Sequence, residues 1–471
     1  MAISRRQFLG RSGAVAGGVV GASLFGNPFT RDAMAMTLGD RYVVSLYLDG
    51  GNDGLNTITP VDNGGSGALR ADYEAARNTG SGGIRLSSGE LLVPGGPSLL
   101  DPNTGSQLGF HPGLYGLSNL YGQGKVAVIQ GCGYPNASLS HDTSAKVWER
   151  ADPNRSGIST GWVGRHLAAH FGPSDIPAVA VRGSIPGEFD QTTTSVLTVS
   201  RVEQFNFPYD SSNGSDSTFR RNALMALADE SLLSGQPVQS QVGAADKSTL
   251  LAADSYPGLH DAYEDDRPSF DQMYDDLGTS AARDLREISK IIYGVENAVP
   301  NVNARYFELR NGGYDNHSDQ GGGSPGGRHY NNHEEVGQAL ETFYADCDDM
   351  GVADKLIVFV WSEFSRRILQ NDTGTDHGTQ GPMFVLGGTV NGGVYGNHPD
   401  IADGSLESGN TIYTQDVANP YRSTDFRDVY GTIMKHWVNV PHATVLSNLL
   451  PLDTGDPNER WATENFDMGF L

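Results

Sequence analysis

The sequence predicts an α/β sandwich, in which helices pack on a mostly parallel β-sheet. Short runs of β-branched and aromatic residues alternate along the chain with stretches of helical periodicity. Several of these runs lead directly into polar, glycine-rich segments. The hydrophobic fraction of 38% and the 61 glycines among 471 residues indicate a sizeable core joined by many loops. Alternation of strands and helices favours a sheet covered by helices.

Four apolar runs are predicted to be strands of this sheet: 41–48, 125–129, 304–309 and 355–361. They are apolar almost throughout, which is typical of parallel strands buried on both faces. Each is followed closely by Asp, Glu or His. Because ligands of open parallel sheets gather outside the carboxyl ends of the strands, we expect these side chains to meet in space.

Four segments are predicted to be helices, because apolar side chains recur in them every three or four residues: 113–120, 270–295, 334–350 and 425–437. Residues 183–265 are richer in Ser, Thr, Gln and Asp, and we expect an insertion or cap there. The main α/β domain is predicted over 36–450, with a turn-rich C-terminal tail over 451–471.

The first 35 residues have the three parts of a twin-arginine signal peptide. Arg5 and Arg6 precede a Gly- and Ala-rich apolar stretch over 12–25, and small residues flank Met34. The alternative is a frayed N-terminal helix that contains two arginines. The apolar stretch is too short to span a bilayer, so we expect no permanent membrane span. The predicted location is the periplasm or the outside of the cell, reached through the twin-arginine export machinery.

The charge balance excludes one broad class of function. Asp and Glu number 56 against 32 Lys and Arg, which gives a net charge of −24. A broad basic face for nucleic acid is therefore not expected. The two cysteines, Cys132 and Cys347, could form one disulfide in an oxidising compartment or remain two buried thiols.

Two acidic residues follow predicted strands directly. Asp49 ends the first strand and precedes two glycines, so its carboxylate could reach a cation without obstruction. The alternative for Asp49 is a turn residue in an Asp-Gly loop. Glu363 follows the apolar run 355–361 and could be a metal ligand or a partner that orients one.

A polar segment before the stretch ending at Trp148 contains candidate catalytic residues. Ser140 and Thr143 carry hydroxyls at a predicted helix N-terminus, where a nucleophile could attack a phosphate or sulfate group. The alternative is that such a residue only caps the helix. His141 could serve as a metal ligand or as a base.

Two Asp/His pairs complete the set of candidates. Asp315 and His317 could face one way in an extended segment, and Asp376 and His377 are adjacent before a glycine. With Asp49, Glu363 and His141 they supply four carboxylates and three imidazoles, enough for a site of two divalent ions.

Two further patterns are ambiguous. Arg366 and Arg367 could hold an anionic substrate or pair with surface acids. His329 and His333 have the spacing of a metal pair on one helical turn, but a solvated helix start is the favoured interpretation.

Motifs in chain order carry a resemblance to a known family: LDGGNDGLN (48–56), GFHPGL (109–114), GYPNASLSH (133–141), GWVGRHL (161–167), YDNHSDQ (314–320), WSEFSRR (361–367), TDHG (375–378) and STDFRDVY (423–430). Over 41–440 the chain resembles the exported bacterial family catalogued as domain of unknown function 1501. That family is placed in the alkaline phosphatase and sulfatase superfamily, whose members hold two metals at the carboxyl ends of the sheet. The resemblance implies an alkaline-phosphatase-like three-layer sandwich.

The resemblance also implies roles for particular residues. Asp49 matches the metal-binding Asp after the first strand, and the pairs Asp315/His317 and Asp376/His377 match later ligands of the superfamily. Ser140, His141 and Thr143 lie where relatives keep the nucleophile. The middle pair is spaced more closely here than is usual, and the chain has no Cys-x-Pro-x-Arg motif, which disfavours a sulfatase that depends on a modified cysteine.

We therefore expect an exported metal-dependent hydrolase that acts on a small phosphate or sulfate ester with two divalent ions. Zn, Mn, Mg and Ca are not distinguished by the sequence. The alternative is a non-catalytic secreted or cell-surface protein that keeps the fold for a structural or binding role.

Overall fold

The computed structural model describes residues 40–471, apart from 65–67, 135–136, 182, 192, 207–213, 400, 402–423, 447–449 and 451–465. Residues 41–471 form one compact unit. The predicted signal peptide over 1–35 and most of the predicted tail over 451–471 lie outside the described residues.

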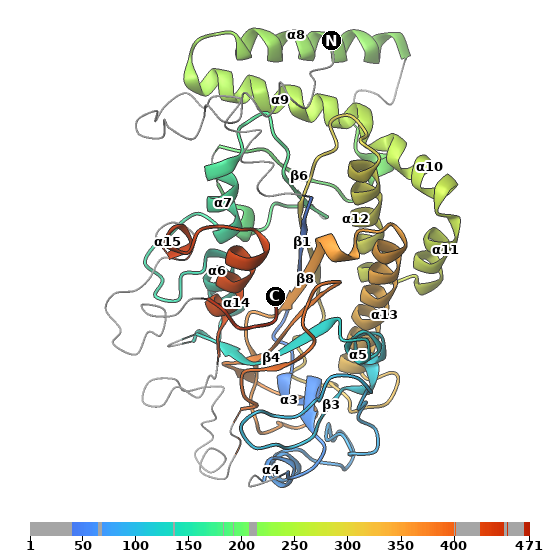
Figure 1. Cartoon of the computed structure of the whole chain (residues 1–471), viewed down its shortest axis with the longest axis vertical. Helices are drawn as coiled ribbons and strands as arrows, with labels where there is room; N and C mark the ends of the chain where they lie inside the picture. Colours follow the sequence, from blue (N-terminus) through green and yellow to red (C-terminus); the bar gives the residue numbers. More distant parts are fainter. Residues whose placement is uncertain are drawn as a thin grey trace, which may run out of the picture. The chain divides into compact units, whose positions relative to one another are not determined.

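A nine-stranded sheet forms the centre of this unit, in the order β12-β4-β11-β8-β1-β7-β5-β6, with β13 paired to β4 (Figure 1). The strand bounds are β1 Tyr42–Leu48, β4 Val126–Gly133, β5 Ala178–Ala180, β6 Val196–Thr198, β7 Tyr306–Asn311, β8 Leu356–Trp361, β11 Gly381–Gly387, β12 Gly393–Tyr395 and β13 Thr424–Asp425. Strand β11 runs antiparallel to β4 and β8, and the other pairings are parallel. The predicted α/β class with a mostly parallel sheet is confirmed.

The order of the three central strands positions the polar segments. Strand β1 is buried along its whole length and pairs in parallel with β7 on one side and β8 on the other. Leu48 lies opposite Asn311, and Tyr47 lies opposite Trp361. The segments that follow these three strands therefore leave the sheet at one edge, as the sequence predicts.

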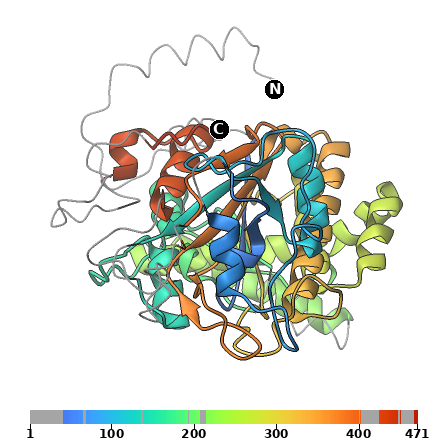
Figure 2. The same ribbon diagram turned by 90° about the horizontal axis from the view of Figure 1, so that it is seen from below.

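Helices cover both faces of the sheet, with α5, α12 and α13 on one side and α6, α7 and α14 on the other (Figures 1 and 2). The helix bounds are α3 Gly54–Thr57, α4 Leu69–Ala76, α5 Tyr115–Gly122, α6 His141–Arg150, α7 Trp162–His170, α8 Gly214–Leu232, α9 Pro237–Ser255, α10 Pro257–Asp266, α11 Pro268–Leu277, α12 Ser280–Glu296, α13 Arg328–Asp349, α14 Phe426–Thr432 and α15 His442–Thr444. Two small antiparallel pairs, β2 Ile58–Pro60 with β3 Leu108–Phe110 and β9 Ser365–Arg366 with β10 His377–Gly378, lie outside the main sheet.

The single helix predicted over 270–295 is wrong. Helix α11 ends at Leu277, where Gly278 adopts the left-handed conformation with φ of 62°. Thr279 then caps α12 by accepting a hydrogen bond from the amide of Ala282. A left-handed glycine followed by an N-cap threonine ends one helix and starts the next, although the apolar periodicity continues across the break. The helix predicted over 425–437 likewise changes type, because 433–437 are π-helical after α14.

Both cysteines are buried free thiols, Cys132 on β4 and Cys347 on α13. Among the described residues, we find no helix whose length and apolar character would allow it to cross a bilayer.

Candidate metal centre

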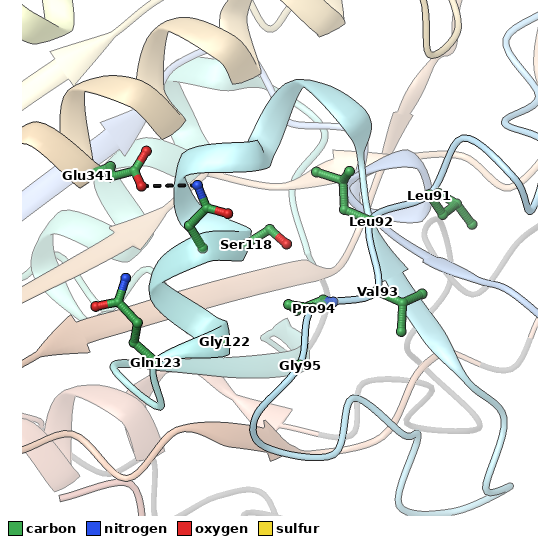
Figure 3. A pocket seen from close by; sticks show the side chains of 10 residues that line it. Leu91, Leu92, Val93, Pro94, Gly95, Ser118, Gly122, Gln123 and Glu341 are labelled. Carbon is green, nitrogen blue, oxygen red and sulfur yellow. Dashed lines mark hydrogen bonds between the residues drawn. The ribbon is translucent and has the colours of Figure 1, made fainter.

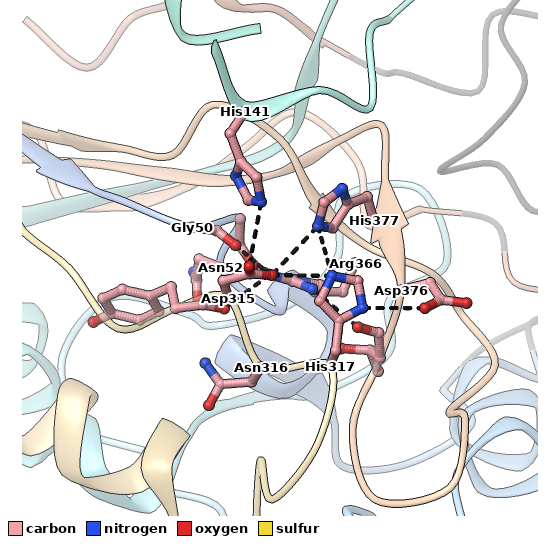
Figure 4. Close-up of polar contacts among 12 residues, drawn as sticks. Gly50, Asn52, His141, Asp315, Asn316, His317, Arg366, Asp376 and His377 are labelled. Atoms are coloured by element: carbon pink, nitrogen blue, oxygen red, sulfur yellow. Dashed lines mark hydrogen bonds and ion pairs between the residues drawn. The ribbon is translucent and has the colours of Figure 1, made fainter.

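Residues from three distant parts of the chain converge at the edge where β1, β7 and β8 end (Figure 4). His141 is the first residue of α6, Asp315 lies in the loop after β7, and His377 begins β10. One ligand atom from each of the three lies within 4.8 Å of those of the other two, close enough to hold a metal ion. The predicted convergence of acids and imidazoles is therefore seen for these residues.

Hydrogen bonds fix the orientation of two of the imidazoles. Nδ1 of His141 lies 2.6 Å from Oε1 of Glu363, and Nδ1 of His377 lies 2.7 Å from the carbonyl oxygen of Leu139. Because both partners can only accept, each Nδ1 carries the hydrogen. In the neutral rings the lone pair is therefore on Nε2. These Nε2 atoms lie 3.5 Å and 3.3 Å from the carboxylate of Asp315.

His317 adds a third imidazole to the group. Its Nδ1 lies 3.2 Å from Oδ1 of Asp376, and its Nε2 lies 3.1 Å from Oδ1 of Asp315. The same Nε2 lies 2.9 Å from Nε2 of His377. Three imidazoles are thus held through Nδ1 with Nε2 directed to one carboxylate, the arrangement in which proteins commonly present histidines to a metal.

Glu363 lies beside the group and is hydrogen-bonded to His141. Its carboxylate is fully buried and accepts hydrogen bonds from the amides of Gly50 and Gly51 at 3.1–3.4 Å. The hydrogen bond that His141 donates to Glu363 raises the pKa of His141, and burial opposes this shift in part. Both predicted roles of Glu363 stay predictions, and its observed contacts are hydrogen bonds accepted from Gly50, Gly51 and His141.

Arg366 is buried beneath the group, so the interpretation of this residue as a holder of substrate is wrong. Its guanidinium donates to the carbonyl oxygens of Gly50, Gly51, Tyr314 and Thr375 and, at 2.8 Å, to Oδ1 of Asp315. Burial by itself raises the pKa of Asp315, but the hydrogen bond and charge of Arg366 outweigh it and lower that pKa to about 2. Asp315 is therefore an anion over the physiological pH range. This cross-link could not be predicted from the sequence, because four of its five acceptors are backbone carbonyls.

The other predicted acidic ligands point to different partners. Asp49 directly follows β1 as predicted, but its carboxylate is paired with Arg310 on the neighbouring strand β7. Asp376 is half-exposed and lies between Nδ1 of His317 and the guanidinium of Arg367. The structure brings Asp376 to the rim of the group and leaves Asp49 outside it.

The candidate nucleophiles lie at the start of α6. Ser140 is its N-cap residue, exposed and without a side-chain hydrogen bond to the helix. Thr143 lies in the first turn and is half-buried. Their hydroxyls flank His141 in the sequence, one position before it and two positions after it.

The interpretation of His329 and His333 as a solvated helix start is wrong, because both are buried on α13. With His111 they form a cluster of three rings whose centroids are 4.1–5.1 Å apart. Burial lowers the pKa of all three, that of His329 to about 3, so they are neutral imidazoles in the folded protein. His329 donates to Asn52 and His333 contacts Thr57, so this cluster supports the loop after β1 from below.

A surface hollow of about 620 Å³ lies elsewhere, between the loop 91–95 and α5 (Figure 3). Glu341 on its wall accepts a hydrogen bond from Asn119 at 3.0 Å. None of the predicted site residues lines it.

Fold and site together define an α/β protein that carries a His/Asp/His group at the carboxyl ends of its parallel strands. The chain belongs to the family described as protein of unknown function (DUF1501), whose model matches residues 92–419. No curated protein matches it.

Proposed function

We propose that this protein is a metal-dependent hydrolase of phosphate or sulfate esters. The observation that carries the proposal is the common orientation of His141, His317 and His377. Each is held through Nδ1 by an acceptor, and each directs Nε2 to the carboxylate of Asp315. Hydrogen bonds of this kind are the usual support of metal-binding histidines.

The donor atoms fit a divalent ion. Nε2 of His141 is buried and has no hydrogen-bond partner among the described residues. The Nε2 atoms of His317 and His377 are 2.9 Å apart, a separation that needs a proton or a cation to relieve lone-pair repulsion. His141, Asp315 and His377 would hold the ion, with His317 as a fourth ligand. Three nitrogens and one oxygen suit Zn²⁺ or a similar transition ion better than Ca²⁺ or Mg²⁺.

When bound, the ion would supply Lewis-acid stabilisation of ester oxygens and would lower the pKa of a hydroxyl or water. The chain supplies the rest. Helix α6 begins at the group, so its positive N-terminal end favours an anionic substrate. Arg367 is part-exposed beside Asp376 and offers a cation to the ester oxygens. Ser140 is exposed at the same end of α6, and its hydroxyl is the first candidate for attack on the phosphate or sulfate group. The hydroxyl of Thr143 is the second candidate.

The proposal extends to the family's placement and to the location of the protein. We place the fold in the alkaline phosphatase and sulfatase superfamily on the motif resemblance, and we propose export through the twin-arginine route on residues 1–35. A second ion, which the resemblance implies, would require Asp49 to leave Arg310 or Asp376 to leave His317.

Metal content and turnover test this function directly. We expect the full chain to bind Zn²⁺ or Co²⁺ and to hydrolyse an aryl phosphate, an aryl phosphodiester or an aryl sulfate. His377→Ala should abolish both properties. His170→Ala on α7 is the matched control and should change neither, because His170 bonds to the carbonyl of His166 within its own helix.

Two outcomes would contradict the proposal. A folded wild-type protein that binds no divalent ion and turns over none of the esters would favour the non-catalytic alternative. Turnover that survives in His377→Ala would show that the reaction takes place elsewhere.

A further inference from the structure

The exposed apolar side chains are concentrated on one hairpin, formed by α8 and α9 and joined by 233–236. This hairpin lies at the end of the unit farthest from α4 (Figure 1). Six large apolar residues in it have exposed fractions of 39–83%: Phe219, Leu224, Leu227, Leu233, Val238 and Val242. Large apolar side chains exposed together on one element of a folded protein commonly mark an interface.

The apolar residues of α8 form a stripe beside its packed side. Leu224 and Leu227 are spaced i, i+3 and therefore share one side of the helix, and the charged Arg220 lies on the same side one turn earlier. Ala228, about 100° further round, is buried. A Cβ at Gly243 of α9 would lie 2.6 Å from the carbonyl oxygen of Ala228, so this side of α8 packs closely on α9. Leu227 is thus about a quarter turn from Ala228, and Leu224 borders the side that α9 covers.

Helix α9 repeats this arrangement. Val238 and Val242 share one exposed side, and Gly243, the next residue, faces α8. In each helix the exposed apolar residues are rotated in the same sense away from the side that packs on the other helix. Because α8 and α9 run in opposite directions, this rotation places the exposed residues of both helices on the same side of the hairpin. Two contact sides about 90° apart on each helix are what a four-helix bundle requires. The hairpin therefore presents half of such a bundle.

The distribution of charge on the hairpin favours a second copy of this chain as its binding partner. The chain has a net charge of −24, but residues 231–245 contain no Asp, Glu, Lys or Arg. This uncharged segment adds no charge repulsion of its own when a second copy approaches the hairpin. Arg220 and Glu230 are both exposed and lie five residues on either side of Met225. In an antiparallel α8 pair about Met225, each Arg220 would face Glu230 of the other copy, with the leucines between them.

We propose that the α8–α9 hairpin is a self-association surface, through which two copies form a two-fold symmetric dimer with a four-helix core. The interface is isologous, so every favourable contact occurs twice. The proposal is independent of the metal centre, which lies at the edge where β1, β7 and β8 end.

Sedimentation or light scattering of the full chain across a wide concentration range tests the proposal. We expect a dimer for the wild type. Leu227→Glu should weaken association by about tenfold or more, because it places two charges in the apolar seam. Met273→Glu on α11 is the matched control, since Met273 is also exposed, and it should leave the dimer unchanged. Circular dichroism would show that both variants fold.

A charge reversal identifies the register of the two helices. Arg220→Glu and Glu230→Arg should each weaken the dimer by roughly threefold or more, and the double variant should restore it. A monomer at every concentration would overturn the proposal, as would a dimer insensitive to Leu227→Glu. A monomer that floats with neutral phosphatidylcholine vesicles would also overturn it and would assign the face to lipid.

Discussion

Glu363 shows how much of the site depends on a residue that would touch no metal. Its two oxygens accept from the amides of Gly50 and Gly51, the hydroxyl of Ser362 and Nδ1 of His141. One buried carboxylate therefore fixes both the loop after β1 and the imidazole ring of His141. A position directly after an apolar strand indicated that Glu363 matters, but whether it binds or orients depends on rotamers and on neighbours from other segments.

Replacing Glu363 by Gln should weaken metal binding without unfolding the protein. The amide has one accepting oxygen, which cannot serve the glycine amides and His141 together, and its NH₂ would face the hydrogen on Nδ1. We expect the affinity for Zn²⁺ or Co²⁺ to fall about 10–100-fold. Calorimetric titration measures the loss, and a thermal melt provides the control. Unchanged affinity would show that His141 is oriented by other contacts.

A second buried carboxyl, Glu188, gives a prediction on pH. Burial raises its pKa well above the usual value of 4.5, and the nearby Glu308 and Glu149 add to the shift. The folded state therefore favours the protonated form, so stability is full below pH 4.5 and falls as pH rises toward the folded-state pKa. Glu188→Gln cannot ionise and could keep a hydrogen bond with Ser45.

We expect Glu188→Gln to be more stable than the wild type at pH 8 and equal to it at pH 4. Thermal melts of the two proteins at both values would measure the difference. A variant that loses stability equally at both pH values would show that the carboxyl is not protonated in the fold.

The elements differ in how far the sequence predicts them. Strands β1, β4, β7 and β8 are predicted because each contains a run of mostly apolar residues. Strands such as β5, β12 and β13 have two or three residues and are defined only by pairing with a neighbouring strand. Such short strands show no hydrophobic periodicity from which they could be predicted. The break between α11 and α12 is similar, because one left-handed glycine overrides an apolar pattern that continues through it.

Gly278→Ala should destabilise the protein by about 1 kcal/mol. Space does not limit the substitution, since the nearest atom to an added Cβ is 3.7 Å away, so the cost comes from φ of 62°. Gly258→Ala, within α10 and with no atom within 4 Å, is the matched control and should be neutral or stabilising. Denaturant unfolding compares them. Equal effects of the two substitutions would show that 277–279 tolerate another backbone path.

At the scale of the whole molecule, parallel pairing of β1 with β7 and β8 brings together residues hundreds of positions apart. This convergence follows from the topology and could be predicted without knowing any side-chain direction. Which carboxylate turns inward could not be predicted, since it depends on competing partners. The register of β1 and β7 places Arg310 beside Tyr47, and Arg310 forms an ion pair with Asp49 there. Arg366 instead forms an ion pair with Asp315, whose carboxylate lies close to the imidazoles.

Two matched substitutions test this division of roles between acids at the same edge. Asp315→Asn should lower the affinity for Zn²⁺ or Co²⁺ at least about tenfold, because it removes the anion on which three Nε2 atoms converge. Asp49→Asn should leave that affinity within about threefold, because the carboxylate is neutralised by Arg310 and lies outside the group. Titration of each variant with Zn²⁺ or Co²⁺ measures its affinity and the number of ions bound per chain, and so shows which of the two acids contributes to metal binding. If Asp49→Asn instead removes one of two ions, Asp49 leaves Arg310 in the loaded protein and the edge holds a metal pair.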